Sequence, residues 1–235
     1  MTPAPETGPA RAELVREMFD RIAGRYDALN RILSLGMDVG WRRKGVHALG
    51  LPPGSLVLDL ACGTGDLSRE LARAGHRAVG FDFSPEMLAR AGTEASLVRA
   101  DVLRLPVGNA VADGIVCGFA LRNVVDLPGL FREASRALRP GGRAVFLEVS
   151  EPQHPVLRFG HGLYVRWVVP FVGGLLSDRE AYAYLPASMA YLPSPDRLAE
   201  MMREAGFDDV RRAALSAGIA QVFAGTRSRR RARRG

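Results

Sequence analysis

The chain has 235 residues, 47% of them hydrophobic, which is enough to bury the core of one ordinary globular domain. Its net charge of +7 is typical of proteins that bind nucleic acid or anionic membranes, but six of its arginines lie within residues 227–235. Without those six, 26 of the 32 basic side chains remain against 25 acidic ones, a net charge of +1. We therefore expect one domain over residues 11–226, with disordered ends at residues 1–10 and 227–235.

The cysteines and the apolar segments exclude several classes of protein. Two cysteines, Cys62 and Cys117, cannot form a disulfide framework and lack the spacing of a zinc site. The four histidines, His161 among them, show no metal-ligand spacing either, and we interpret them as structural or exposed. Residues 1–10 have neither the basic start nor the apolar stretch of a secretory signal. The most apolar run, residues 167–176, is shorter than the roughly 18 to 20 residues that a spanning helix needs. These features predict a cytoplasmic protein without a bound metal.

The hydrophobic periodicity predicts a helical cap followed by an α/β fold. Residues 12–22 and 26–49 have helical patterns, the second broken at Gly36 and Gly40, and residues 11–51 form the predicted cap. From residue 52 onward, short β-rich runs alternate with helical segments, as in a parallel sheet with crossover helices. The predicted strands are 56–61, 77–81, 97–100, 111–118, 142–149, 210–215 and 219–224. The predicted helices are 66–74, 85–91, 127–138 and 195–205, with an insertion over residues 151–193.

A glycine-rich turn follows the first predicted strand, in the segment Asp59 to Asp66. Gly63, Thr64 and Gly65 join the strand to a helix, and such a turn lets backbone N–H groups approach a nucleotide-like ligand closely. A dinucleotide fingerprint requires a third Gly or Ala, but that position is Ser68. The turn therefore favours a ligand without a pyrophosphate group.

Two further carboxylates follow neighbouring strands, Asp82 after the second and Asp101 after the third. Asp82 lies 17 residues beyond Gly65, where an acidic side chain can accept hydrogen bonds from a ribose diol. Each of the two is also a plausible helix cap when it is considered singly. Together they indicate one ligand crevice at the carboxyl edge of the sheet.

These motifs resemble those of class I S-adenosylmethionine-dependent methyltransferases. The resemblance implies a Rossmann-like, seven-stranded, mostly parallel sheet with helices on both faces and an antiparallel last strand, and it implies S-adenosylmethionine as the cofactor. It places the methionine end at the glycine turn, the ribose at Asp82 and the adenine at Asp101 and Val102. The full set of implied cofactor-binding residues is Asp59, Gly63, Thr64, Gly65, Asp82, Phe83, Asp101, Val102 and Gly118.

Four separate segments resemble the quinone-biosynthesis C-methyltransferases, which act on demethylmenaquinone and ubiquinone precursors. They are the Phe19 to Trp41 segment, Phe119-Ala120-Leu121-Arg122-Asn123-Val124, the Arg139 to Ser150 segment, and Ala183-Tyr184-Leu185-Pro186-x-Ser188. The chain departs from the family pattern at Gly118, where Ser is usual, and at Ala120, where Gly is usual. Both departures lie in the predicted cofactor wall.

The second resemblance implies transfer of a methyl group from S-adenosylmethionine to a ring carbon of a polyprenyl hydroquinone. Demethylmenaquinol is the leading substrate, while a ubiquinone precursor and a phenolic natural product stay open. Arg122 is expected to stabilise the negative charge of the ring oxygen, with Asn123 as a second donor and a water molecule as the proton acceptor. The alternative for Arg122 is a surface ion pair with Asp126. The expected substrate-binding residues are Tyr26, Asn30, Tyr182 and Tyr184.

The predicted insertion also contains an apolar segment with interspersed arginines, residues 155–176. This composition suits either a membrane interface where a polyprenyl tail enters or a lid packed on the core. We expect a polyprenyl quinol and a membrane surface as partners and no nucleic acid, so the protein would lie at the inner face of the membrane. The arginine tail alone suggests RNA binding instead, and both a monomer and a homodimer stay open.

Overall fold

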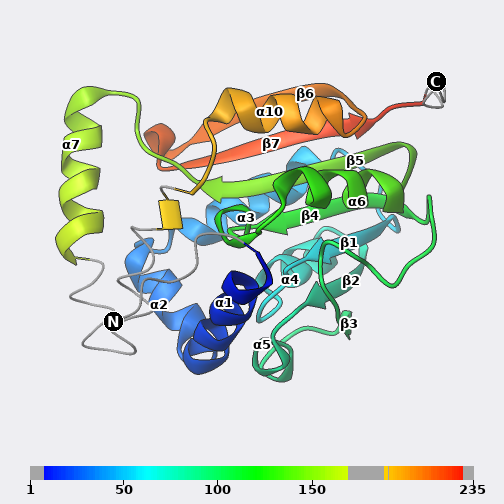
Figure 1. Ribbon diagram of the computed structural model, residues 1–235, viewed down its shortest axis with the longest axis horizontal. Helices are drawn as coiled ribbons and strands as arrows, with labels where there is room; N and C mark the ends of the chain where they lie inside the picture. The colour runs from blue at the N-terminus through cyan, green and yellow to red at the C-terminus, as the bar shows by residue number, and fades with distance from the viewer. Residues whose placement is uncertain (1–7, 169–187, 190, 230–235) are drawn as a thin grey trace.

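The computed structural model describes residues 8–168, 188–189 and 191–229. Their centre is a seven-stranded sheet with the strand order β3-β2-β1-β4-β5-β7-β6 (Figure 1). β7 is antiparallel to both of its neighbours, whereas the pairs from β3 to β5 are parallel. The predicted mostly parallel sheet with an antiparallel last strand is thus confirmed. The strands are β1 (Leu56–Leu60), β2 (Arg77–Asp82), β3 (Ser96–Arg99), β4 (Ala112–Gly118), β5 (Leu138–Val149), β6 (Phe207–Leu215) and β7 (Ala220–Arg227).

Helices cover both faces of this sheet (Figure 1). α3 and α4 pack together against one face, and α6 and α10 pack together against the other. α1 contacts α5, and α2 contacts α3, which itself packs on the sheet; we call α1, α2 and α3 the cap. The helices are α1 (Pro9–Ile22), α2 (Tyr26–Leu33), α3 (Met37–Ala48), α4 (Asp66–Arg73), α5 (Pro85–Ala89), α6 (Leu127–Ala137), α7 (Pro155–Leu163) and α10 (Pro195–Glu204).

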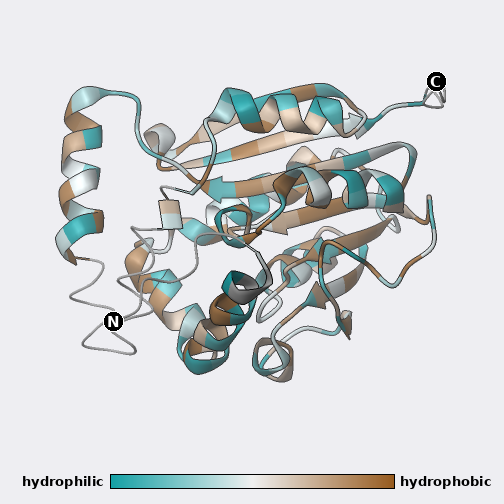
Figure 2. Cartoon of the chain, viewed as in Figure 1, coloured by the Kyte–Doolittle hydropathy of each residue, from teal (hydrophilic) through white to brown (hydrophobic). Residues whose placement is uncertain are grey.

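The central strands are apolar because both of their faces are buried. All of β4 up to Cys117 is buried, and Figure 2 shows much of β4 in the brown of hydrophobic residues. On the α6 side of the sheet, the rings of Phe131 and Phe146 pack edge-to-face with their centroids 4.9 Å apart. On the other side, Leu67 and Leu71 of α4 pack with Val57. Runs buried on both faces are typical of parallel sheets, which is why the sequence indicated them clearly.

Several element boundaries differ from the expected ones. β5 begins at Leu138 rather than Gly142, because the Pro140-Gly141-Gly142 turn forms an irregularity within the strand instead of preceding it. β6 begins earlier than expected, at Phe207, and β7 extends to Arg227, where it pairs with Phe207. The sheet therefore includes the first residue of the expected disordered tail, and Ser228 N donates a hydrogen bond to Gly206 O at 2.9 Å. At the other end, α1 already begins at Pro9.

The described part of the insertion is helical and lies at one side of the molecule (Figure 1). α7 continues into a π-helical turn, η2 (Tyr164–Val168). Tyr164 anchors it to the cap, since its hydroxyl donates a hydrogen bond to Leu33 O at 3.0 Å. Among the described residues, no helix is long and apolar enough to cross a membrane.

Candidate functional site

A crevice of about 170 Å³, here called the strand-end crevice, opens where β1, β2, β3 and β4 end. Its wall includes six of the nine residues expected to bind the cofactor. Helix α1 of the cap closes one side of the crevice, because Val15, Arg16 and Phe19 line it as well. The six residues are Gly63, Asp82, Phe83, Asp101, Val102 and Gly118.

Asp82 organises the crevice through both carboxylate oxygens. Its Oδ2 accepts a hydrogen bond from Gly63 N at 2.7 Å, and its Oδ1 accepts one from Ser84 N at 2.9 Å. Burial raises the pKa of Asp82, opposed by these backbone hydrogen bonds. The carboxylate thus ties the glycine turn after β1 to the loop after β2, at the edge where an α/β sheet binds its ligand.

The remaining three predicted cofactor residues lie beneath or beside the crevice rather than in its wall. Asp59 is completely buried, accepts a hydrogen bond from Ser68 Oγ at 2.7 Å, and has its pKa raised by burial to about 7. Ser68, which breaks the dinucleotide fingerprint, is therefore the partner of Asp59. Gly65 has a φ of +84°, and a side chain there would meet Thr93 Cγ2 at 2.8 Å. Thr64 is buried under the cap and donates a hydrogen bond to Asp27 Oδ1.

The crevice fits a nucleoside on chemical grounds. Asp82 presents acceptors for a ribose diol, and Phe83, Val102 and Leu103 give the apolar walls that a flat base needs. The Asp101 carboxylate accepts a hydrogen bond from Leu103 N at 2.9 Å, which orders this loop. A Cβ atom at position 118 would lie 2.6 Å from Leu67 Cδ1. In this position Leu67 leaves no room for the Ser that is usual in the family, and Gly118 fits instead.

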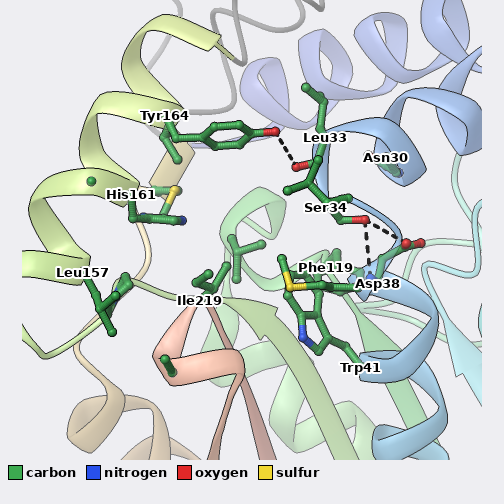
Figure 3. Close-up of a pocket in the computed structure, with 18 of the residues that line it drawn as sticks. Asn30, Leu33, Ser34, Asp38, Trp41, Phe119, Leu157, His161, Tyr164 and Ile219 are labelled. Atoms are coloured by element: carbon green, nitrogen blue, oxygen red, sulfur yellow. Dashed lines mark hydrogen bonds between the residues drawn. The ribbon is translucent and has the colours of Figure 1, made fainter.

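A second, larger space of about 440 Å³ adjoins the crevice, and we call it the apolar cavity. It lies between the cap helices α2 and α3, the end of β5, the turn that precedes β7, and α7. Figure 3 shows Leu157 and His161 of α7 and Tyr164 of η2 facing Asn30, Ser34 and Trp41 of the cap across it. The sequence-predicted residues Tyr26, Asn30 and Arg122 line this cavity, whereas Tyr182 and Tyr184 lie outside the described residues.

Tyr26 and Phe119 form a wall shared by the crevice and the cavity. Phe119 has a φ of +60°, directly after β4, and its ring lies 6.2 Å from that of Trp41. The Arg42 guanidinium lies 5.2 Å from the Phe119 ring centroid. Burial raises the pKa of Tyr26, so its hydroxyl stays protonated at neutral pH. Tyr26 and Phe119 therefore mark the place where the crevice and the cavity adjoin.

Arg122 and Asn123 lie in the short 3₁₀ turn η1 (Leu121–Asn123) and point to different spaces. Arg122 lines the apolar cavity, and Asn123 lines the strand-end crevice. Arg122 is buried and pairs with Glu148 of β5. The surface pair between Arg122 and Asp126 is not formed, because Asp126 caps α6 by accepting a hydrogen bond from Gly129 N at 2.8 Å.

Two functional features were missed by sequence reasoning. Glu148 lies within a segment that the sequence already linked to the family, but nothing in the pattern indicated that its side chain would reach Arg122. His161 was expected to be structural or exposed, yet it lines the apolar cavity, and burial lowers its pKa. The described residues contain no cluster of His, Cys, Asp or Glu side chains that would hold a metal ion.

Comparison with known proteins decides the family. Residues 7–227 match the ubiE/COQ5 methyltransferase family. The chain belongs to this family. It is 44% identical to a demethylmenaquinone methyltransferase of Roseiflexus castenholzii over 92% of this chain and 94% of that protein. It is also 40% identical to a ubiquinone/menaquinone biosynthesis C-methyltransferase UbiE of Syntrophotalea carbinolica, over 91% and 94% of the two chains.

Membership of the ubiE/COQ5 family identifies the chain as an S-adenosylmethionine-dependent C-methyltransferase of menaquinone or ubiquinone biosynthesis. Solved structures support the fold independently. A Thermotoga maritima structure described as an SAM-dependent methyltransferase superposes with a TM-score of 0.66 at 17% identity, over 91% of this chain and 99% of that one. The expected fold and cofactor are thereby confirmed.

Proposed function

We propose that the enzyme methylates a ring carbon of a polyprenyl hydroquinone and that its substrate is demethylmenaquinol. The observation that carries this proposal is the shared wall of Tyr26 and Phe119 between the strand-end crevice and the apolar cavity. A methyl donor in the crevice and an apolar ring in the cavity would then meet at one place. The demethylmenaquinone methyltransferase relatives from Roseiflexus castenholzii and Deinococcus radiodurans, 44% and 43% identical, favour the naphthoquinol.

The proposed mechanism relies on alignment and charge stabilisation. S-adenosylmethionine supplies an electrophilic methyl group, and the crevice residues Gly63, Asp82 and Asp101 would hold it. Tyr26 and Phe119 would keep the ring carbon in line with that methyl group, and good alignment is worth about 7 to 11 kcal/mol. Arg122 would donate hydrogen bonds to the ring oxygen as it becomes negative. A water molecule would accept the ring proton, because a guanidinium does not act as a base at neutral pH.

A ubiquinone precursor is the second candidate substrate. Relatives from Syntrophotalea carbinolica and Geobacter, 40% and 41% identical, carry names that cover both pathways. A benzoquinol has a smaller ring than a naphthoquinol, so both would enter a cavity of about 440 Å³. A phenolic natural product is a third, less specific alternative.

A methyl-transfer assay distinguishes these substrates. Purified enzyme and radiolabelled S-adenosylmethionine are mixed with one of three acceptors: reduced demethylmenaquinone, a demethoxy-benzoquinol or a simple phenol. The two quinols carry a short prenyl chain. We expect the naphthoquinol to be methylated with the highest kcat/KM. Preference for the benzoquinol would select the second candidate, and no product from either quinol would refute the proposal.

We also propose that the outer face of α7 contacts the membrane in which the quinol resides. Phe159 and Leu163 lie four residues apart on that face, with exposed fractions of 71% and 47%, and Trp167 of the adjoining turn η2 is 65% exposed. Residues 155–168 contain Arg158 and Arg166 but no acidic side chain, which suits an anionic lipid surface. The opposite face of the same helix lines the apolar cavity, so a lipid tail would have a short path inward.

Sedimentation with anionic liposomes at low salt tests this contact. Phe159→Asp should reduce the bound fraction several-fold. Val111→Asp changes another exposed apolar residue at the opposite end of the sheet and should not reduce it. Absence of binding by the unmodified enzyme would exclude the membrane contact but leave the methylation proposal intact.

A further inference from the structure

Glu148 is a buried carboxylate that the proposed mechanism does not use. It is the penultimate residue of β5, and its side chain is completely buried. Removing a carboxylate from water is unfavourable unless the group is paired with a cation and hydrogen-bonded on both oxygens. The contacts of Glu148 meet both conditions, and they all involve the segment next to the apolar cavity.

The two carboxylate oxygens hold Arg122 by its side chain and its backbone together. Glu148 Oε1 accepts hydrogen bonds from Arg122 Nη1 and from Val149 N, the latter at 2.8 Å. Glu148 Oε2 accepts one from Arg122 N at 3.3 Å. Arg122 Nη1 also donates to Phe119 O at 2.8 Å. The Nη1 group of the guanidinium is therefore fixed by Glu148 and by Phe119.

The rest of the Arg122 guanidinium retains donors for a ligand. Arg122 is 6% exposed and lines the apolar cavity, and its Nε is buried without a hydrogen-bond partner among the described residues. An unpaired buried N–H of a charged group is costly, so a ligand oxygen within reach would be bound strongly. The ion pair orients the guanidinium, and Nη2, which makes no hydrogen bond to the described residues and is not fully buried, can address the cavity.

We propose that Glu148 is a positioning residue for methyl transfer: it fixes the Arg122 guanidinium for the ring oxygen of the quinol and partly neutralises its charge. This inference rests on the proposed function. Glu148 makes no direct contact with the reacting atoms in this scheme and acts through Arg122. Its carboxylate therefore controls both the direction of the Arg122 donors and the positive potential that the quinol hydroxyl meets.

Two substitutions separate these effects. Glu148→Gln has nearly the same shape, but its NH₂ group would face N–H donors that now point to a carboxylate oxygen. Glu148→Asp keeps the charge and both oxygens on a side chain that is shorter by one methylene. We expect each variant to lower kcat on the order of 10- to 100-fold, with the KM for the quinol and the affinity for S-adenosylhomocysteine changed less than about threefold.

The pH profile of kcat provides a readout that a purely structural role would not change. With Glu148→Gln the positive charge of the guanidinium is no longer balanced, so the quinol hydroxyl should ionise more easily. The rising limb of the plot of kcat against pH should then move to lower pH by about one unit. Glu148→Asp should leave the limb in place. The other charged or titratable groups that face the cavity are Tyr26, Asp38, Arg42, His161 and Tyr164, and they are unchanged in both variants. Cys117, on the neighbouring strand β4, and Gln221, paired with Glu148 on β7, are unchanged as well.

A double-mutant cycle completes the test. Arg122→Gln combined with Glu148→Gln removes both buried charges, so this variant should fold and bind S-adenosylhomocysteine even if a single substitution destabilises the chain. If Glu148 acts through Arg122, the double variant should have the same kcat as Arg122→Gln alone. Additive losses, an unshifted profile for Glu148→Gln, or equal losses of kcat and cofactor affinity would each overturn the proposal. The unmodified enzyme must methylate the quinol first, so failure of the proposed function is recognised separately.

Discussion

The strand-end crevice and the apolar cavity differ in how the chain builds them. The crevice is formed mainly by the loops that follow consecutive strands, and its central contact joins Asp82 to Gly63, 19 residues earlier. The cavity collects side chains from α2, α3, η1, α7 and the turn that precedes β7, so its walls come from residues 26 to 219. The first site depends on local turns at one sheet edge, the second on the packing of distant helices.

This difference separates the part of the enzyme that recognises the cofactor from the part that selects the substrate. A turn fixed by backbone conformation and one carboxylate changes little when surrounding helices move. A cavity between helices changes with each side chain that lines it. We therefore expect substitutions in the crevice to affect cofactor affinity for every substrate, and substitutions in the cavity to change substrate use while cofactor affinity is retained.

The largest effect is expected from Asp82→Ala. The variant loses hydrogen bonds to Gly63 N and Ser84 N and the proposed acceptor for the ribose. Losing several charge-assisted hydrogen bonds should weaken binding of S-adenosylhomocysteine by about 100-fold or more, as measured by calorimetry. Asp208→Ala, at an exposed position of β6, is the control and should bind normally. Unaltered affinity of the Asp82 variant would show that the ligand lies elsewhere.

The next largest effect is expected from filling the apolar cavity, and two glycines of α7 provide the test and its control. A Cβ atom added at Gly160 or Gly162 would meet no atom within 4 Å, but only Gly160 lines the cavity. Gly160→Phe should fill the space and lower kcat/KM for the quinol about 10- to 100-fold. Gly162→Phe makes the same change on the same helix and should have little effect. The S-adenosylhomocysteine affinity of both variants should equal that of the unmodified enzyme, and a loss in Gly160→Phe would mean that the two sites are not independent.

The same difference explains how much could be predicted from the sequence. Gly63, Asp82 and Asp101 were recognisable because strand ends of a parallel sheet meet at one edge and the residues follow apolar runs directly. The pair of Arg122 with Glu148 was not, since 26 residues separate them and their contact depends on the register of β4 with β5. His161 was missed for a related reason: only the orientation of α7 places it at the cavity.

A smaller effect concerns stability and arises from Asp59 beneath the crevice. Burial raises the pKa of Asp59 from 3.8 to about 7, so the folded chain binds a proton that the unfolded chain has released. Stability from this group therefore falls as pH rises between about 4 and 7. Asp59→Asn removes that penalty, and its advantage in free energy of unfolding should grow across this range to at most about 4 kcal/mol.

Thermal melting at pH 5 and pH 8 measures the Asp59 effect. The difference in melting temperature between Asp59→Asn and the unmodified enzyme should be larger at pH 8. Asp208→Asn provides an exposed control on β6. A difference that is constant with pH would show that Asp59 does not take up a proton in the folded enzyme.

The smallest effect is expected at the arginine-rich end. Deletion of residues 230–235 removes four of the six terminal arginines and should change quinol methylation by less than about twofold, because it leaves every described residue of the crevice and the cavity in place. Deletion from residue 227 is a harsher cut, since Arg227 pairs with Phe207 in the sheet and Ser228 N donates to Gly206 O at 2.9 Å. It should lower the melting temperature. If deletion of residues 230–235 alone abolished activity, the RNA alternative would regain support, because an electrostatic role of the tail would then be essential.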